Sequence, residues 1–258
     1  MSILLVDIGN TRVKWTTLDD GRIGRQKAIA HVGWSGQDIA RHLLGQPRQA
    51  KKIERVVIVS VAGPRIDRGF TAETKRLIGI KPEFFASARR AAGVTTLYQE
   101  PWRLGADRLV GVIGAFELSK HRPVCIISVG TAMTLDLVDA RGRHRGGAIV
   151  PAPSLMVGSL LSETHGIRRR AQGGAGGRDF FARSTRAAIA QGARYAAAAV
   201  ADRAVTEARA TLGQKPLVLL TGGAADSIRA LIRSPHRHIP DLVLRGLAVI
   251  ASQRPGAD

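Results

Sequence analysis

Cysteine is almost absent from this chain of 258 residues. The single thiol, Cys125, lies in an apolar run, so no disulfide can form within the chain, and we expect a buried, unreactive side chain. Apolar runs long enough to span a membrane are also lacking. Because the sequence opens on a strand-like segment with no basic leader, we expect a cytoplasmic protein with no membrane partner.

Acidic residues are scarce too, since 20 Asp and Glu stand against 39 Lys and Arg, a formal net charge of +19. A charge of this size attracts polyanions such as nucleic acid. The arginines are scattered, however, and aromatic residues, which could stack on bases, make up only 4% of the chain. No spacing typical of zinc ligands occurs, and His236 and His238 are expected at the surface. We therefore favour an arginine-rich surface over nucleic-acid binding.

One short pattern occurs twice, once in each half of the chain. Each copy has an apolar strand, a turn with a glycine, a second strand and a second turn with a glycine. The two turn glycines are Gly9 and Gly21 in the first copy and Gly130 and Gly142 in the second, so the copies align without a gap. Two such hairpins facing each other could hold the phosphates of a nucleotide between them.

Strands and helices alternate in both halves, which predicts an α/β fold built by duplication. We expect one domain over residues 1–120 and another over residues 121–258, with a hinge at residues 121–123. Residues 167–178, rich in arginine and glycine, are expected to form an exposed loop. Besides the hairpins, the patterns predict strands at residues 55–61, 81–86, 147–150 and 217–221, and helices at residues 36–44, 66–78, 105–118, 182–210 and 241–252.

The turn of the first hairpin suits phosphate binding. Gly9 lets the backbone approach a ligand closely, and Asn10, Thr11 and exposed amides can donate hydrogen bonds to phosphate oxygens. The carboxylate of Asp7 at its mouth would repel phosphate unless a hard cation such as Mg²⁺ lies between them, directly or through water. A simple strand-ending turn would use the same residue types. The second copy of the pattern favours phosphate binding.

Five short segments occur in an order that resembles the type III pantothenate kinases, and the resemblance extends over essentially the whole chain. They are residues 7–14 (DIGNTRVK), 105–108 (GADR), 130–136 (GTAMTLD), 221–223 (TGG) and 241–247 (DLVLRGL). The first segment alone indicates only the wider superfamily of sugar kinases, Hsp70 and actin, whereas GADR between the hairpins narrows the assignment. The resemblance implies a duplicated RNase H-like, actin-like ATPase fold and a homodimer, because the family's pantothenate site lies at a subunit interface.

The resemblance also implies that the protein phosphorylates pantothenate with ATP to 4′-phosphopantothenate, the first step of coenzyme A biosynthesis. Asp107 is then the proton acceptor that orients the primary hydroxyl of pantothenate, and Asp7 supports Mg²⁺. The residues implied to bind ATP are Asp7, Ile8, Gly9, Asn10, Thr11, Arg12, Val13, Lys14, Thr131, Gly222 and Gly223. Those implied to bind pantothenate are Tyr98, Gly105, Ala106, Asp107, Arg108 and Thr185.

Two positions depart from the family pattern. Ser128 stands where the family has an aspartate that helps to bind a monovalent cation, K⁺ or NH₄⁺. A neutral hydroxyl is a weaker ligand than a carboxylate, so the need for this cation is open. The family's Pro-Gly becomes Pro151-Ala152, and because alanine disfavours positive φ we expect a different local loop.

Simpler roles and other functions stay open at this stage. Asp107 could cap a helix N-terminus, Thr185 could cap the long helix, and Tyr98 could be a packing residue. The chain could be a catalytically impaired relative that acts as a regulatory or nucleic-acid-binding protein. It could also be a kinase for another small alcohol, since phosphate-binding motifs do not select the acceptor.

Overall fold

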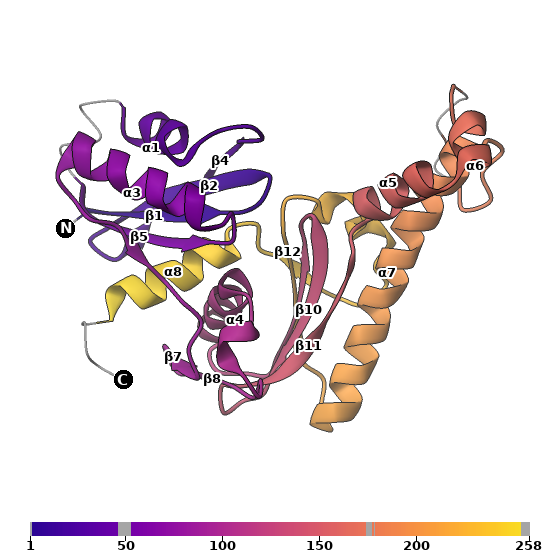
Figure 1. Cartoon of the computed structure of the whole chain (residues 1–258). Helices are drawn as coiled ribbons and strands as arrows, with labels where there is room; N and C mark the ends of the chain where they lie inside the picture. The colour runs from indigo at the N-terminus through magenta and orange to yellow at the C-terminus, as the bar shows by residue number, and fades with distance from the viewer. Residues whose placement is uncertain (1, 46–52, 174–176, 178, 254–258) are drawn as a thin grey trace. The chain divides into compact units, whose positions relative to one another are not determined.

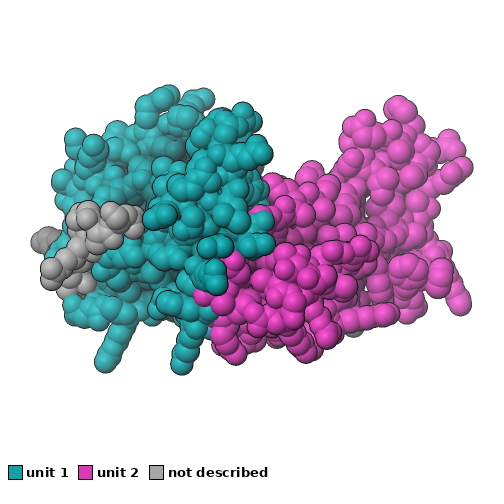
Figure 2. All heavy atoms as spheres, turned by 90° about the horizontal axis from the view of Figure 1, so that it is seen from below, with its two compact units in different colours: residues 1–121, 141–145, 241–258 teal, residues 122–140, 146–240 magenta. Residues whose placement is uncertain are grey.

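The chain forms two compact units in a computed structural model that describes residues 2–45, 53–173, 177 and 179–253 (Figure 1). Unit 1 comprises residues 1–121, 141–145 and 241–258, and unit 2 comprises residues 122–140 and 146–240 (Figure 2). The expected domain division near residue 120 stays a prediction. None of the described helices is long and apolar enough to cross a membrane.

A mixed sheet forms the middle layer of unit 1, with strand order β3-β2-β1-β5-β6 and with β4 paired to β2. The strands are β1 (Ser2–Ile8), β2 (Arg12–Asp19), β3 (Arg22–Ile23), β4 (Lys27–Ala30), β5 (Ile53–Ser60) and β6 (Glu83–Phe84). β1 pairs antiparallel with β2 and parallel with β5. Because helices cover both faces, β1 and β5 are nearly continuous apolar runs rather than alternating ones.

Helices α1 (Gly36–Leu44) and α3 (Pro64–Ile78) cover one face of this sheet, and α4 (Ala106–Leu118) and α8 (Leu242–Ser252) cover the other (Figure 1). Successive strand residues point to opposite faces. Leu4 and Val6 of β1 therefore join the core with α1 and α3, whereas Ile3 and Leu5 join the core with α4 and α8.

Two glycines let α4 and α8 cross with their backbones almost touching. A Cβ atom added at Gly246 would lie 1.9 Å from the carbonyl oxygen of Val110, and one added at Gly114 would lie 2.5 Å from that of Leu242. Neither position can hold a larger residue unless a helix moves. This crossing fixes where α4 lies under the sheet.

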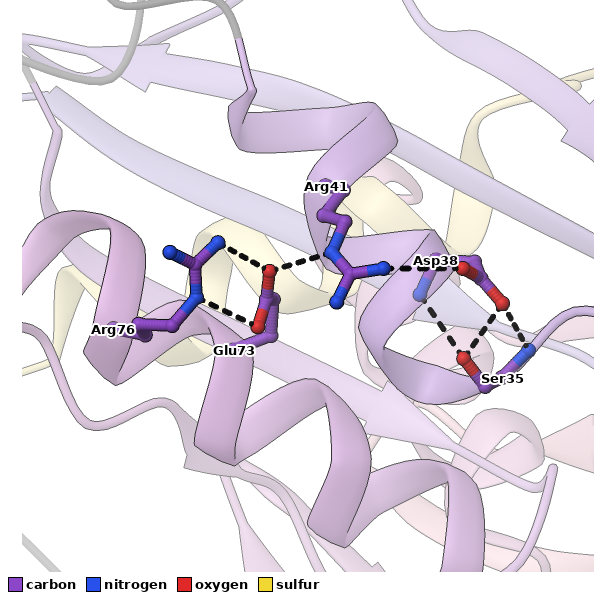
Figure 3. A network of polar contacts seen from close by, with 5 residues as sticks. All are labelled: Ser35, Asp38, Arg41, Glu73 and Arg76. Atoms are coloured by element: carbon purple, nitrogen blue, oxygen red, sulfur yellow. Dashed lines mark hydrogen bonds and ion pairs between the residues drawn. The ribbon is translucent and has the colours of Figure 1, made fainter.

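A buried carboxylate ties α1 to α3 on the other face (Figure 3). Glu73 of α3 has a side chain only 5% exposed, and it accepts hydrogen bonds of 2.7 Å from Nε of Arg41 and 2.7 and 3.0 Å from Arg76. These bonds lower the pKa of Glu73 to about 2. Arg41 also lies 3.6 Å from Asp38, which forms a capping box with Ser35 at the start of α1.

Unit 2 has a sheet in the order β13-β12-β9-β10-β11 with the long helix α7 (Thr185–Leu212) packed on it through alanines. The strands are β9 (Val124–Val129), β10 (Ala132–Val138), β11 (Arg143–Pro151), β12 (Leu217–Thr221) and β13 (Arg237–His238), and the shorter helices are α5 (Pro153–Glu163) and α6 (His165–Arg170). The first residues of β11 belong to unit 1, where they pair with β8 (Val94–Thr96), which in turn pairs with β7 (Arg90–Ala91).

The predicted helices and the strands of both hairpins are confirmed, with ends that shift by a few residues. Cys125 is buried as expected, and burial raises its pKa to about 12, so the thiol stays protonated near neutral pH. At Ala152 the chain is extended, with φ −72°, and the residue is the N-cap of α5, a helix that was not predicted.

Other expectations were wrong. The start of the expected loop at residues 167–178 is helical, since residues 167–170 belong to α6; residues 174–176 and 178 lie outside the described residues. β4, β7 and β8 were not predicted either. His238 lies in β13 with a side chain 16% exposed, so it is half-buried rather than fully at the surface.

The α4–α8 crossing gives a first prediction. Gly114→Ala and Gly246→Ala should each lower the free energy of unfolding by about 2 kcal/mol or more, because a methyl group there overlaps backbone atoms. The control is Gly111→Ala in the same helix, where the added Cβ meets only Val243 Cγ2 at 3.8 Å. It should be neutral or add up to about 1 kcal/mol from helix propensity. Urea unfolding followed by circular dichroism measures the three variants, and equal stabilities would contradict the crossing.

The Glu73 network predicts acid sensitivity. A glutamate in an unfolded chain titrates near pH ~4.3, whereas the pKa of Glu73 is about 2 in the folded protein. Its contribution to stability is therefore complete above the unfolded pKa and is lost as the pH falls through about 2. In the unmodified protein the urea midpoint should therefore fall as the pH drops from ~4.3 to about 2. In Glu73→Gln this fall should be smaller. Glu100→Gln, which removes an exposed partner of Arg103, should leave the fall unchanged.

Candidate functional site

The turn of the first hairpin is tight and open to solvent on its outer side. Ile8 and Val13 are its last paired residues, and the N–H of Gly9 donates to the carbonyl of Arg12 at 3.0 Å. Asn10 and Thr11 are exposed. Within the described part of the chain, nothing accepts a hydrogen bond from their backbone N–H groups. The turn thus presents donors of the kind that bind phosphate oxygens.

An ion pair with a buried carboxylate lies at the base of this turn. Asp7 is 6% exposed, and its Oδ2 lies 3.5 Å from Nζ of Lys14, which faces it across the hairpin. Burial raises the pKa of Asp7, the positive charge of Lys14 opposes that rise, and the negative charge of Asp107 adds to it. The two predicted carboxylates are therefore close enough to interact electrostatically, although they lie 100 positions apart in the sequence.

Asp107 reaches this place on the first turn of α4. Gly105, not Asp107, is the N-cap residue, so the simple capping role for Asp107 was wrong. The Oδ1 atom of Asp107 accepts the N–H of Arg108 at 2.8 Å. A Cβ atom at Gly105 would lie 2.8 Å from the same oxygen, so the glycine leaves room for the carboxylate. The helix N-terminus also favours the negative charge there.

Tyr98 lies beside Arg108 in the same unit. Nη1 of Arg108 donates to the Tyr98 hydroxyl at 3.1 Å, and the guanidinium carbon is 5.8 Å from the ring centre. The other ring contact of Tyr98 is with the buried His144, stacked at 5.8 Å and 17°. Arg89 holds the loop by donating to three of its backbone carbonyls, including that of Tyr98. The packing role and a polar role of Tyr98 are therefore compatible.

The second hairpin differs from the first by one residue. Val129 pairs with Met133, which leaves three residues in the turn, against four between Ile8 and Val13. The N–H of Gly130 donates to the carbonyl of Ala132 at 2.9 Å. The gapless alignment of the two copies did not reveal this, because the spacing from the first glycine to the second, Gly9 to Gly21 and Gly130 to Gly142, is the same in both.

Most of the predicted residues of unit 2 lie near the end of β9. Ser128 pairs with Thr221, and the next residue, Gly222, has φ +99° and would place a Cβ 2.2 Å from the carbonyl oxygen of Val129. This close approach brings Gly222 and Gly223 next to the turn that holds the exposed Thr131. Thr185 is the first residue of α7, but the cap is Ser184, which accepts from the N–H of Ala187 at 3.2 Å, so the capping role of Thr185 was wrong.

The carboxylates of unit 1 suit Mg²⁺, which is held partly by phosphates and water. Among the residues described they are too few to hold a metal by protein ligands alone. The described residues contain no group of three or more His, Cys, Asp or Glu side chains that could hold a metal. Asp7 and Asp107 supply carboxylate oxygens, and a divalent cation beside them would offset both the burial of Asp7 and the repulsion between the two charges. Mg²⁺ is commonly held by one or two carboxylates together with phosphates and water.

His31 is a functional candidate that sequence reasoning missed. It lies after β4, is buried, and its Nε2 atom is 2.7 Å from the carbonyl oxygen of Gly9 in the first turn. No local pattern marks this contact, because the two residues are 22 positions apart and β4 was not predicted.

Comparison with protein families and curated sequences gives matches along most of the chain. A family model described as type III pantothenate kinase matches residues 3–207. The type III pantothenate kinase of Nitrosococcus oceani is 35% identical over 253 residues, covering 96% of this chain and 93% of the relative. That of Herminiimonas arsenicoxydans is 36% identical over 251 residues, covering 96% and 97%.

Solved structures share the fold at low sequence identity. Component A of the (R)-2-hydroxyglutaryl-CoA dehydratase of Acidaminococcus fermentans has a TM-score of 0.55 and 14% identity, covering 97% of this chain and 96% of that one. A ROK hexokinase from Thermus thermophilus has a TM-score of 0.51 and 14% identity, covering 97% of both chains. The expected actin-like ATPase fold, with two mixed α/β sheets, is confirmed.

Proposed function

We propose how particular residues carry out the reaction of the type III pantothenate kinase family, to which this chain belongs. The chain is a pantothenate kinase, and the reaction is the ATP-dependent phosphorylation of pantothenate, the first step of coenzyme A biosynthesis. The observation that carries the assignment of residues is the electrostatic interaction between Asp7 and Asp107 in unit 1.

The first hairpin is our proposed site for the phosphates of ATP. The exposed N–H groups of Asn10 and Thr11 would donate to phosphate oxygens, and Lys14 would add a positive charge beside them. Asp7 would hold Mg²⁺, directly or through water, and the ion would neutralise charge on the phosphates. The other residues assigned to this segment are Ile8, Gly9, Arg12 and Val13.

Asp107 is our proposed proton acceptor. Its carboxylate would bind the primary hydroxyl of pantothenate and accept its proton as the γ-phosphoryl group moves to the oxygen. Such a transfer proceeds through a loose transition state, so positioning matters more than strong basicity. The bond from the Arg108 N–H and the space left by Gly105 support this role, because they fix one carboxylate oxygen.

The remaining contacts to pantothenate are assigned to neighbours of Asp107 and to the start of α7. Arg108 and Tyr98 form a hydrogen-bonded pair that could bind the pantothenate carboxylate or amide. Gly105 and Ala106 offer backbone atoms, and Thr185 offers a hydroxyl.

In unit 2 we assign Thr131, Gly222 and Gly223 to the nucleotide, since small residues and a hydroxyl lie together there. We also propose that the enzyme works in the cytoplasm, where ATP is available.

A homodimer is our proposed assembly, and its support is the apolar surface of unit 2. Five large apolar side chains there are between 40% and 87% exposed: Ile149, Leu155, Leu160, Phe180 and Phe181. Phe180 stacks edge-on against both Phe181 and Tyr195, so the aromatic side chains form one group. Exposed apolar groups of this kind typically mark protein interfaces.

The role of Asp107 predicts a selective loss of turnover. Asp107→Asn keeps the shape of the side chain but cannot accept the proton, so kcat should fall by about 10²-fold or more. The affinity for ATP, measured by titration calorimetry, should stay within about two-fold. The matched control is Glu117→Gln at the exposed end of the same helix, which should keep normal kcat. Normal turnover by the Asp107 variant would show that the proton goes elsewhere.

The ion assignments predict different responses to Mg²⁺ and to K⁺. Removal of Mg²⁺ with a chelator should abolish turnover, because ATP phosphates beside Asp7 need a divalent ion. Exchange of Na⁺ for K⁺ should change kcat by less than about two-fold, since Ser128 offers no charge to a monovalent cation. Ser128→Asp should increase the stimulation by K⁺. A strong K⁺ requirement in the unmodified enzyme would contradict the role given to Ser128.

The dimer proposal predicts a mass of twice 27.5 kDa by light scattering. Phe181→Glu together with Leu160→Glu should yield a folded monomer, because charges on the apolar surface cannot be buried without cost. Val32→Glu, at an apolar position of unit 1 that is 77% exposed, should leave the dimer intact. A monomeric unmodified protein would refute the assembly.

A further inference from the structure

His31 makes two hydrogen bonds to the turn of the first hairpin. Its ring lies within unit 1 and is 4% exposed. Nε2 lies 2.7 Å from the carbonyl oxygen of Gly9, and since a carbonyl can only accept, Nε2 carries a proton and donates. The backbone N–H of the same residue donates to the carbonyl of Thr11 at 3.1 Å.

These bonds decide which way the peptide groups of the turn face. In a trans peptide the N–H points opposite to the C=O of the preceding residue. The Gly9 carbonyl is turned toward His31, so the N–H of Asn10 must point away from His31. The Thr11 carbonyl also faces His31, so the N–H of Arg12 points away from it too. The turn therefore presents the N–H groups of Asn10 and Arg12 on the side opposite the histidine.

The histidine bond also replaces a bond that a plain hairpin would make. Gly9 donates to the Arg12 carbonyl, and an ordinary antiparallel pair would return a bond from the Arg12 N–H to the Gly9 carbonyl. Among the described residues that return bond is missing, and the imidazole occupies the Gly9 carbonyl instead. Without the ring, the turn could close on itself and withdraw an N–H donor from the ligand.

We propose that His31 is a positioning residue for ATP, which holds the Gly9–Arg12 turn open so that its N–H groups bind the phosphates. The inference rests on the proposed binding of ATP phosphates at this turn. His31 touches no reacting atom, and it acts only through the orientation of the turn. Its loss should therefore affect ATP and leave pantothenate unaffected.

The experiment measures steady-state kinetics of three full-length variants with ATP and pantothenate varied separately. His31→Leu removes the donor and should raise the KM for ATP about ten-fold, with the KM for pantothenate unchanged. His31→Gln can place an amide N–H where Nε2 stood, so it should restore the KM for ATP to within about two-fold of the unmodified enzyme. The control is His42→Leu, since His42 packs on Trp15 and Trp34 nearby and has no bond to the turn.

The possible results separate the inference from the function. An unchanged KM for ATP in His31→Leu, equal changes for both substrates, or no rescue by glutamine would each overturn it. If His31→Leu does not fold, His31→Asn serves instead, because its shorter amide cannot reach the Gly9 carbonyl, and it must bind ATP more weakly than His31→Gln. An unmodified enzyme that turns over pantothenate while these variants behave normally would refute the role of His31 alone. An inactive unmodified enzyme would refute the proposed function.

Discussion

The close crossing of α4 and α8 is the constraint on which unit 1 depends. Gly114 and Gly246 let the two backbones touch, and this contact decides how far α4 lies along the sheet. The first turn of α4 carries Asp107, and the end of β1 carries Asp7. The two carboxylates interact because a pair of glycines sets the position of one helix.

The two hairpins share a plan and differ in chemistry. The first has an Asp7–Lys14 ion pair at its base and a four-residue turn whose Gly9 carbonyl is held by a histidine. The second has Ser128 at the matching place and a turn that is one residue shorter. The framework thus occurs twice, whereas the carboxylate at the base of the turn is present in the first copy only.

Much of the fold could be predicted because its signals are local. The apolar runs of β1 and β5, and the Ser35 capping box before α1, each act within a few residues. Residues 167–170 show the limit of such signals. Three arginines beside glycines favour a loop by composition, yet these residues form the last turn of α6.

The contacts that build the site were harder to predict because they join distant segments. Family resemblance indicated Asp7 and Asp107, but nothing in the sequence says that they lie together or that Gly246 sets the distance. His31 was missed for the same reason, as a hydrogen bond to a carbonyl leaves no pattern in side-chain types.

The place of α8 in the chain has a consequence for biosynthesis. This helix belongs to unit 1, but it follows all of unit 2 in the sequence. During translation, strands β1 to β6 and helix α4 leave the ribosome long before their partner does. The side chains of Val110 and Leu5 pack with Leu244 and Leu247 of α8, so they stay uncovered until α8 has been synthesised. A nascent chain therefore holds an incomplete first unit for most of its synthesis, and chaperones that bind apolar surface have their longest opportunity there.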